Sequence, residues 1–174
     1  MTIAIGFAGS SGSGKTTLIS KIIPYLQKLG HRVAVIKHDG HGHYKEAEGT
    51  DSARFLDAGA DCTIVSGERF IVAFERRDEE VSLEQVMARI SDADIILVEG
   101  YKQSALPKIA VMLRAEHIEV LSRMNGPLLA VAAGFEQHTS LPELPVVPWF
   151  DSNDAASIAG YFVQLMSERE RFHP

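Results

Sequence analysis

Gly9-Ser10-Ser11-Gly12-Ser13-Gly14-Lys15-Thr16 follows an almost unbroken apolar run, Ile3 to Ala8, near the start of the sequence. The apolar residues after Thr16 recur at helical spacing until Gly30 ends the pattern. A buried strand, a glycine-rich loop and a helix in this order form the context of a phosphate-binding loop. The sequence therefore predicts a nucleotide-binding α/β domain in which residues 9–16 hold the phosphates.

This loop has the composition that a bound phosphate chain requires. Its glycines let the backbone wrap tightly and point N–H groups at phosphate oxygens, while the helix dipole favours negative charge. Lys15 is expected to reach the β- and γ-phosphates, and the Thr16 hydroxyl to bind Mg²⁺. The alternative, a glycine-rich turn with an incidental lysine, is disfavoured by the flanking strand and helix. The residues assigned to nucleotide binding here are Gly9, Gly12, Ser13, Gly14, Lys15, Thr16 and Thr17.

Strands and helices alternate along the rest of the chain. Further strands are expected at residues 32–37, 95–98, 109–113 and 128–132, and helices at 50–59, 83–90 and around 158–166. Residues 63–65 and 71–74 are typical of a β-hairpin. We expect one domain spanning residues 1–174. Its predicted fold is α/β, that of a P-loop NTPase with a mostly parallel sheet flanked by helices, plus a β-hairpin extension at about residues 62–76.

The strand predicted at residues 95–98 is followed by Glu99 and resembles a Walker B strand. Asp94 is the rival acid, but it enters the strand, and at about 3.3 Å per residue it lies about 16 Å from Glu99. Ligands of an α/β sheet bind at the carboxyl ends of its strands, which favours Glu99. We expect Glu99 to be catalytic and to hold Mg²⁺ together with Thr16. The alternative is an ordinary acid at a strand end.

A second unusual segment is Lys37-His38-Asp39-Gly40-His41-Gly42-His43, at the carboxyl end of another predicted strand. Three readings remain open for it: a metal site, a solvated loop, or a site for an anion or substrate facing the nucleotide. A structural zinc site is disfavoured because no cysteine pair lies nearby. Asp51 and Arg54 begin the next helix and either order this loop or cap that helix.

Composition narrows the function classes. The 174 residues have a net charge of −6, which argues against a general nucleic-acid binder. No apolar run approaches the length of a membrane span, so we expect no membrane association. The single cysteine, Cys62, permits no internal disulfide, and residues 1–7 lack the features of a signal peptide. A cytoplasmic location is therefore expected.

Several segments together resemble the MobB family, the molybdopterin-guanine-dinucleotide biosynthesis protein B. The lysine-histidine segment and the Val-Glu-Gly-Tyr-Lys segment, in this order, are more specific than the phosphate loop alone. The resemblance covers the first two thirds of the chain, and we add Lys37, His38, Asp51 and Gly100 to the predicted nucleotide site. The matching segments are Gly9 to Thr16, Val35-Ile36-Lys37-His38, Gly49-Thr50-Asp51-Ser52, Ala58-Gly59-Ala60 and Val98-Glu99-Gly100-Tyr101-Lys102.

The resemblance implies a GTP-binding homodimer with weak Mg²⁺-dependent GTPase activity. It also implies a partner, the guanylyltransferase MobA, which attaches GMP to molybdopterin with the assistance of this family. One departure concerns the base: related GTP-binding folds often place a guanine-reading aspartate after a late strand, and residues 130–134 have none nearby. Glu136 is the candidate substitute.

Two other functions compete with this one. A P-loop small-molecule kinase needs an acceptor pocket and commonly an arginine-bearing lid, for which Arg76 and Arg77 are candidates. These arginines follow the predicted hairpin, however, and the sequence contains no long helical insertion. The third possibility is a nucleotide-dependent partner switch in which hydrolysis is incidental.

Overall fold

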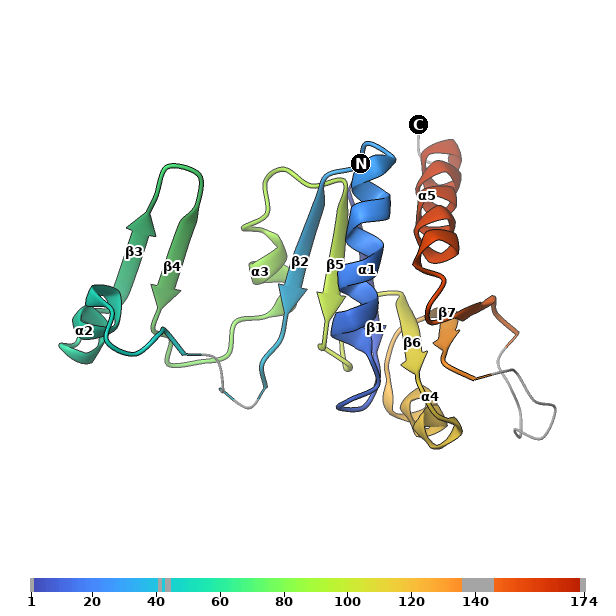
Figure 1. Cartoon of the computed structure of the whole chain (residues 1–174), viewed down its shortest axis with the longest axis horizontal. Helices are drawn as coiled ribbons and strands as arrows, with labels where there is room; N and C mark the ends of the chain where they lie inside the picture. Colours follow the sequence, from blue (N-terminus) through green and yellow to red (C-terminus); the bar gives the residue numbers. More distant parts are fainter. Residues whose placement is uncertain (1, 41, 43–44, 136–145, 173–174) are drawn as a thin grey trace. The chain divides into compact units, whose positions relative to one another are not determined.

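The computed structural model describes residues 2–40, 42, 45–135 and 146–172 (Figure 1). Two compact units are formed, one by Met1–His38 with Met87–Pro174 and the other by Asp39–Val86. Each is described by itself, and the single-domain organisation stays a prediction. Among the described residues, no helix combines the length and apolar character needed to cross a bilayer.

The first unit contains a six-stranded sheet in the order β2-β5-β1-β6-β7-β8. All of its strand pairs are parallel, which confirms the α/β prediction. The first strand, β1, lies between β5 and β6, so the phosphate loop leaves the sheet from an interior strand. The strands are β1 Ile3–Ala8, β2 Val33–Lys37, β5 Ile95–Glu99, β6 Lys108–Met112, β7 Leu128–Ala133 and β8 Trp149–Asp151.

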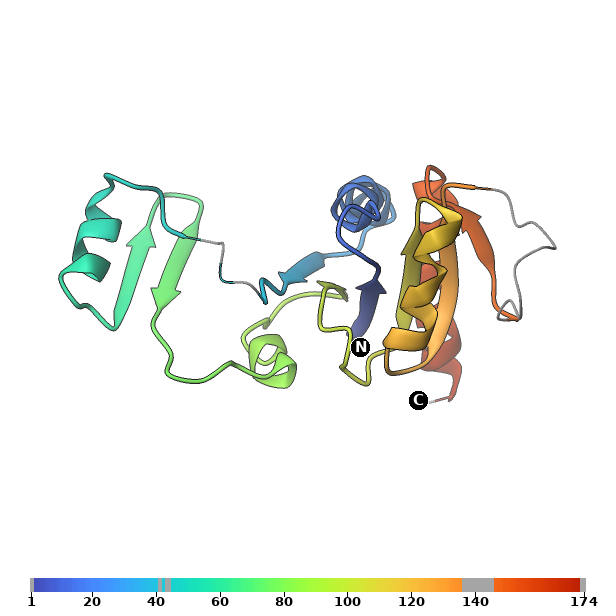
Figure 2. The ribbon, with the colours of Figure 1, turned by 90° about the horizontal axis from the view of Figure 1, so that it is seen from below.

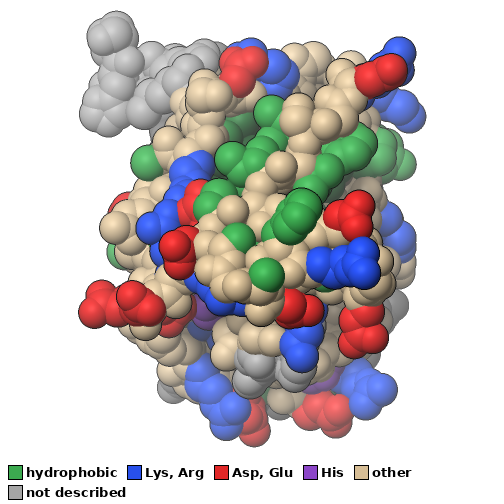
Figure 3. All heavy atoms as spheres, turned by 90° about the vertical axis from the view of Figure 1, so that its left-hand side faces the viewer, with side chains coloured by type: hydrophobic (Ala, Val, Ile, Leu, Met, Phe, Trp, Pro, Cys, Tyr) green, Lys and Arg blue, Asp and Glu red, His purple; other side chains and the backbone are tan. Residues whose placement is uncertain are grey.

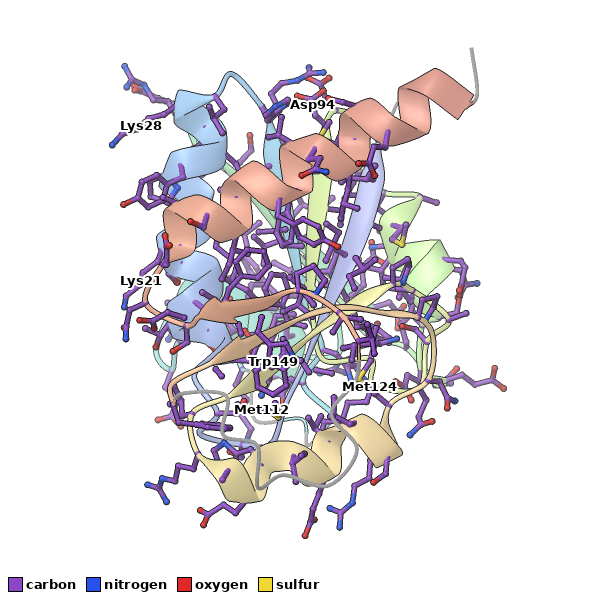
Figure 4. All side chains as sticks on the ribbon, turned by 90° about the vertical axis from the view of Figure 1, so that its right-hand side faces the viewer. Lys21, Lys28, Asp94, Met112, Met124 and Trp149 are labelled. Atoms are coloured by element: carbon purple, nitrogen blue, oxygen red, sulfur yellow. The ribbon has the colours of Figure 1, made fainter. Side chains whose placement is uncertain are left out.

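Helices cover both faces of this sheet because its interior strands are apolar on both sides. The helices α1 Lys15–Lys28 and α5 Ala155–Phe172 pack together on one face, where Phe7 and Phe162 meet edge to face with centroids 6.1 Å apart. The opposite face packs against the 3₁₀ helix η1 Ala115–Glu119 and the short helix α4 Val120–Arg123. Figure 4 shows Met112, Met124 and Trp149 within that second layer. Successive residues of β6 and β7 alternate between the two layers.

The second unit is built from α2 Asp51–Asp57 and the antiparallel hairpin of β3 Cys62–Ser66 and β4 Ile71–Glu75 (Figure 2). Thr50 caps α2 by accepting a hydrogen bond from the Ala53 N–H at 3.1 Å. The Gly67 N–H donates to the Phe70 carbonyl across the hairpin loop at 2.9 Å. The predicted hairpin and its extent are therefore confirmed.

The helix predicted at residues 83–90 is shorter in the structure, as α3 Leu83–Met87. Its predicted start is confirmed, because the Ser82 N–H donates to the Gln85 side chain at 3.0 Å and the Gln85 N–H donates to Ser82 Oγ at 3.3 Å. The Ile90 N–H then donates to the Met87 carbonyl, three residues back. This turn ends the helix before the chain enters β5.

Candidate functional site

The loop between β1 and α1 has a backbone that only glycine adopts without strain at two positions. Gly12 and Gly14 have φ angles of 74° and 87°. At Gly9 a Cβ atom would lie 2.2 Å from Ser13 Oγ and 2.8 Å from the Val111 carbonyl oxygen, so a side chain does not fit. Ser13 is fully buried, and its hydroxyl has no hydrogen-bond partner among the described residues. The loop is shaped as a cradle with an unsatisfied buried hydroxyl.

Lys15 closes over this loop. Its Nζ donates to the carbonyl oxygens of Gly9 and Ser10 at 3.0 and 2.9 Å. Burial lowers the pKa of Lys15, the Glu99 carboxylate opposes that shift, and the positive charges of Lys102 and Lys37 add to it. An anion bound beside Lys15 would reduce the repulsion among these lysines.

Thr16 and Glu99 meet at the same end of the sheet. The Thr16 hydroxyl lies 2.9 Å from both carboxylate oxygens of Glu99, whose side chain is only 13% exposed. Lys37 pairs with Glu99 in the register of β2 and β5, and its Nζ lies 4.0 Å from Glu99 Oε1. A hydroxyl and a carboxylate are oxygen ligands of the kind that Mg²⁺ takes together with phosphate oxygens and water. The residues present therefore fit a magnesium-nucleotide complex.

Asp94, the rival acid, lies just before β5, at the end of the sheet opposite to the phosphate loop (Figure 4). Its side chain accepts a hydrogen bond from the Arg32 N–H at 2.7 Å, and its carbonyl accepts one from the Ile3 N–H at 3.0 Å. These contacts tie the starts of three strands together. Asp94 therefore has a structural role away from the phosphate loop.

The segments that follow β2 and β5 pack closely. The His38 N–H donates to the Glu99 carbonyl at 2.9 Å, and a Cβ atom on Gly100 would lie 2.9 Å from the His38 Cβ. Gly100 and Tyr101 both have positive φ angles, 95° and 46°, the second being uncommon for an aromatic residue. Tyr101 stacks on His38 with ring centroids 4.3 Å apart. Lys37, His38 and Gly100 thus lie at the same end of the sheet as Glu99.

Four other residues of the predicted site and loop lie away from the contacts described above or outside the described residues. Thr17 is exposed in the first turn of α1. Asp51 belongs to the second unit, where it is the first residue of α2 and pairs with Arg54 at 3.5 Å, so its nucleotide contact stays a prediction. His41 and His43 lie outside the described residues. Within the described ranges, no group of three or more His, Cys, Asp or Glu side chains is placed to hold a metal ion.

Lys108 is a residue that sequence patterns did not single out. It opens β6 and is fully buried, with its stem against Gly6. Its Nζ donates to the carbonyls of Ser104, Leu106 and Asn125, the last two at 3.0 and 2.7 Å. Burial lowers the pKa of Lys108. This lysine holds the segment after Tyr101 against the turn before β7.

The carboxyl ends of β7 and β8 lie at the same end of the sheet as the phosphate loop. Ala133 is the register partner of Asp151, and the Ser152 N–H donates to the Ala133 carbonyl at 2.7 Å. A hollow of about 460 Å³ lies here, lined in part by Gly134, Trp149 and Asp151. Glu136, the candidate guanine reader, lies outside the described residues.

A family model described as "Molybdopterin guanine dinucleotide synthesis protein B" matches residues 4–134, about three quarters of the chain. The chain belongs to the MobB family. The recognition made from the phosphate loop, the lysine-histidine segment and the Val-Glu-Gly-Tyr-Lys segment is therefore confirmed.

Individual MobB relatives extend this match. The chain is 37% identical over 133 residues to the molybdopterin-guanine dinucleotide biosynthesis adapter protein of Haemophilus influenzae, covering 75% of this chain and 74% of that protein. It is 36% identical over 171 residues to the Escherichia coli protein of the same name, covering 95% and 94%. A crystal structure of a MobB homolog from Bacillus stearothermophilus superposes with a TM-score of 0.72 at 25% identity, covering 97% and 99%. The fold is thus that of the MobB family.

Proposed function

We propose that this protein is a GTP-binding adaptor of molybdenum-cofactor biosynthesis, which assists the attachment of GMP to molybdopterin and hydrolyses GTP weakly. The observation that carries the proposal is the convergence of Lys15, Thr16 and Glu99 in a member of the MobB family. The names of the Haemophilus influenzae and Escherichia coli relatives, both adapter proteins of this pathway, support the assignment.

Each residue has a distinct role in this proposal. When nucleotide binds, the Lys15 ammonium group donates to β- and γ-phosphate oxygens instead of to the carbonyls of Gly9 and Ser10. The backbone N–H groups of the loop donate to the same phosphates. Thr16 and Glu99 face the metal position, where Mg²⁺ supplies charge stabilisation when bound. Glu99 orients the attacking water and accepts its proton. Lys37, 4.0 Å from Glu99, contributes positive charge beside the γ-phosphate.

The partners follow from the same assignment. A MobA-like guanylyltransferase and molybdopterin are the proposed partners, with Lys37 and His38 facing the phosphate of the pterin. A lysine and a protonatable imidazole suit an anionic ligand. The alternative kinase function gains no support from Arg76 and Arg77, since Arg76 donates to the Leu56 carbonyl and Arg77 pairs with Glu75, both within the second unit.

Reconstituted guanylylation tests the function. The protein is added to a MobA-like transferase, molybdopterin and limiting GTP, and molybdopterin guanine dinucleotide is measured over time. We expect stimulation by the wild type and none by Lys15→Ala, because the variant cannot deliver nucleotide. Lys28→Ala, at the other end of α1, is the matched control and should stimulate like the wild type. Absence of stimulation by the wild type would contradict the adaptor function.

The homodimer is proposed to form through the hairpin of the second unit. Ile64 and Ile71 are 64% and 74% exposed. Figure 3 shows hydrophobic side chains gathered on the side of the molecule that it presents. A hollow of about 1280 Å³ between α2 and the hairpin adds further apolar surface. Contiguous exposed apolar side chains of this kind often mark a protein–protein interface.

Light scattering after size-exclusion chromatography measures this association. We expect a dimer at micromolar concentration for the wild type and a monomer for Ile71→Glu, because the variant places a charge in the proposed interface. Leu29→Glu, at an exposed apolar position in the first unit, should remain dimeric. A monomeric wild type, or a dimeric Ile71→Glu protein, counts against the hairpin interface.

A further inference from the structure

The hollow at the carboxyl ends of β7 and β8 lies on the same edge of the sheet as the phosphate loop. Its volume is about 460 Å³, and its lining includes Phe135 and Trp149. Aromatic side chains of this kind provide surfaces on which nucleic-acid bases stack. The indole N–H of Trp149 is buried and has no acceptor among the described residues. The hollow thus offers an aromatic surface of the kind on which a base can stack.

Leu113 connects this hollow to the phosphate loop. A Cβ atom on Gly14 would lie 3.2 Å from the Leu113 side chain, and one on Gly134 would lie 3.1 Å from it. Leu113 is therefore in contact range of both the phosphate loop and the residue that begins the hollow, and it is partly exposed. Since β7 is two strands from β1, about 10 Å separates the two strand ends. A nucleoside attached to phosphates on residues 9–16 can cover this distance.

Asp151 provides the hydrogen-bonding group at the hollow. Its Oδ1 accepts a hydrogen bond from the Asn153 N–H at 2.8 Å, which fixes the carboxylate at the end of β8. Its Oδ2 makes no hydrogen bond or ion pair with the residues that the structure describes. A carboxylate has about four acceptor positions, so both oxygens retain capacity for a ligand. The register places Asp151 beside Ala133, at the end of the late strand where the sequence lacks an aspartate.

We propose that this hollow holds the base of the bound nucleotide and that Asp151 selects guanine. This proposal rests on the proposed function and adds the residue that determines its base specificity. The two carboxylate oxygens accept the N1–H and 2-amino hydrogens of guanine, which lie side by side on one edge of the base. Adenine has an N1 lone pair there and no 2-amino group, so it repels the carboxylate and loses both hydrogen bonds.

The Asp151→Asn variant should prefer xanthine to guanine. Xanthine keeps the N1–H donor of guanine but has a carbonyl oxygen in place of the 2-amino group. An asparagine amide offers one acceptor and one donor, which match xanthine and mismatch guanine. We expect affinity for GTP to fall roughly 10- to 100-fold, the worth of a bidentate base contact, while affinity for XTP rises above that of the wild type.

Titration calorimetry with GTP, ATP, XTP and inorganic tripolyphosphate separates the base from the phosphates. Tripolyphosphate should bind the wild type and Asp151→Asn equally, which also shows that the variant is folded. Asp92→Asn, the same change at the amino end of β5, is the matched control and should keep the wild-type order of affinities. The expected wild-type order is GTP well above ATP and XTP.

Two results would overturn the base site while leaving nucleotide binding intact: equal GTP and ATP affinity in the wild type, or an unchanged preference for GTP over XTP in Asp151→Asn. Loss of GTP binding without any gain for XTP, in a variant that still binds tripolyphosphate, would also overturn it. If the wild type binds neither tripolyphosphate nor any nucleotide, both the proposed function and the base site fail.

Discussion

Replacing Lys15 by alanine is expected to weaken GTP binding by roughly 100-fold or more, the scale of removing one partner from a desolvated charge pair. Lys15 is the cation that already closes over the loop, with Nζ within 3.0 Å of two loop carbonyls. Its removal takes away the only side-chain cation that the structure places directly on the described loop, so the β- and γ-phosphates lose that charge–charge contact. The loop carbonyls of Gly9 and Ser10 lose a donor, but the buried apolar core beneath α1 is unchanged, so the fold should persist.

Titration calorimetry with GTP in the presence of Mg²⁺ measures this loss. Lys28→Ala is the matched control, since it removes the same side chain from the other end of α1. Thermal unfolding of both variants should stay close to that of the wild type. Wild-type GTP affinity in Lys15→Ala would remove residues 9–16 from the nucleotide site.

Glu99→Gln is expected to act on hydrolysis instead of binding. The glutamine keeps the shape of the side chain and can still accept a hydrogen bond from the Thr16 hydroxyl, but it cannot take a proton from water. Loss of a general base typically lowers the rate by roughly 10²- to 10⁴-fold. The Mg²⁺-dependent GTPase rate should therefore fall on this scale, while GTP affinity in excess EDTA changes little.

Phosphate release under single-turnover conditions checks this expectation. Glu116→Gln, which removes the charge of an exposed acid in η1, is the control and should hydrolyse GTP at the wild-type rate. Both variants replace a glutamate by a glutamine, so they differ only in the position of the lost carboxylate. Equal single-turnover rates in Glu99→Gln and the wild type would exclude Glu99 from the hydrolytic step.

Local patterns were enough to predict the centre of the fold. The phosphate loop follows from a change of period between β1 and α1, and Glu99 from its place after a buried strand. The capping box at Ser82 and Gln85 is likewise local, because both partners lie within four residues. The structure adds the contact between Thr16 and Glu99, which joins residues 83 positions apart.

Features that depend on tertiary packing could not be predicted in this way. The strand β8 has only three residues and follows Pro148, so it shows no strand-like alternation. No sequence pattern therefore indicates that Asp151 ends a strand, and only its pairing with Ala133 in the sheet shows this position. The helical segment from Ala115 to Arg123 was missed for a similar reason, because its short 3₁₀ and α parts carry too few turns to show a period.

Lys108 has a consequence for how this sequence can diverge. Its three acceptors are backbone carbonyls, so they persist whichever side chains stand at Ser104, Leu106 and Asn125. An apolar residue at Lys108 would instead leave all three carbonyls without their buried donor at once. Substitutions at Ser104, Leu106 or Asn125 therefore keep all three acceptors, whereas a substitution at Lys108 removes the one donor that they share and with it the contact that positions this loop.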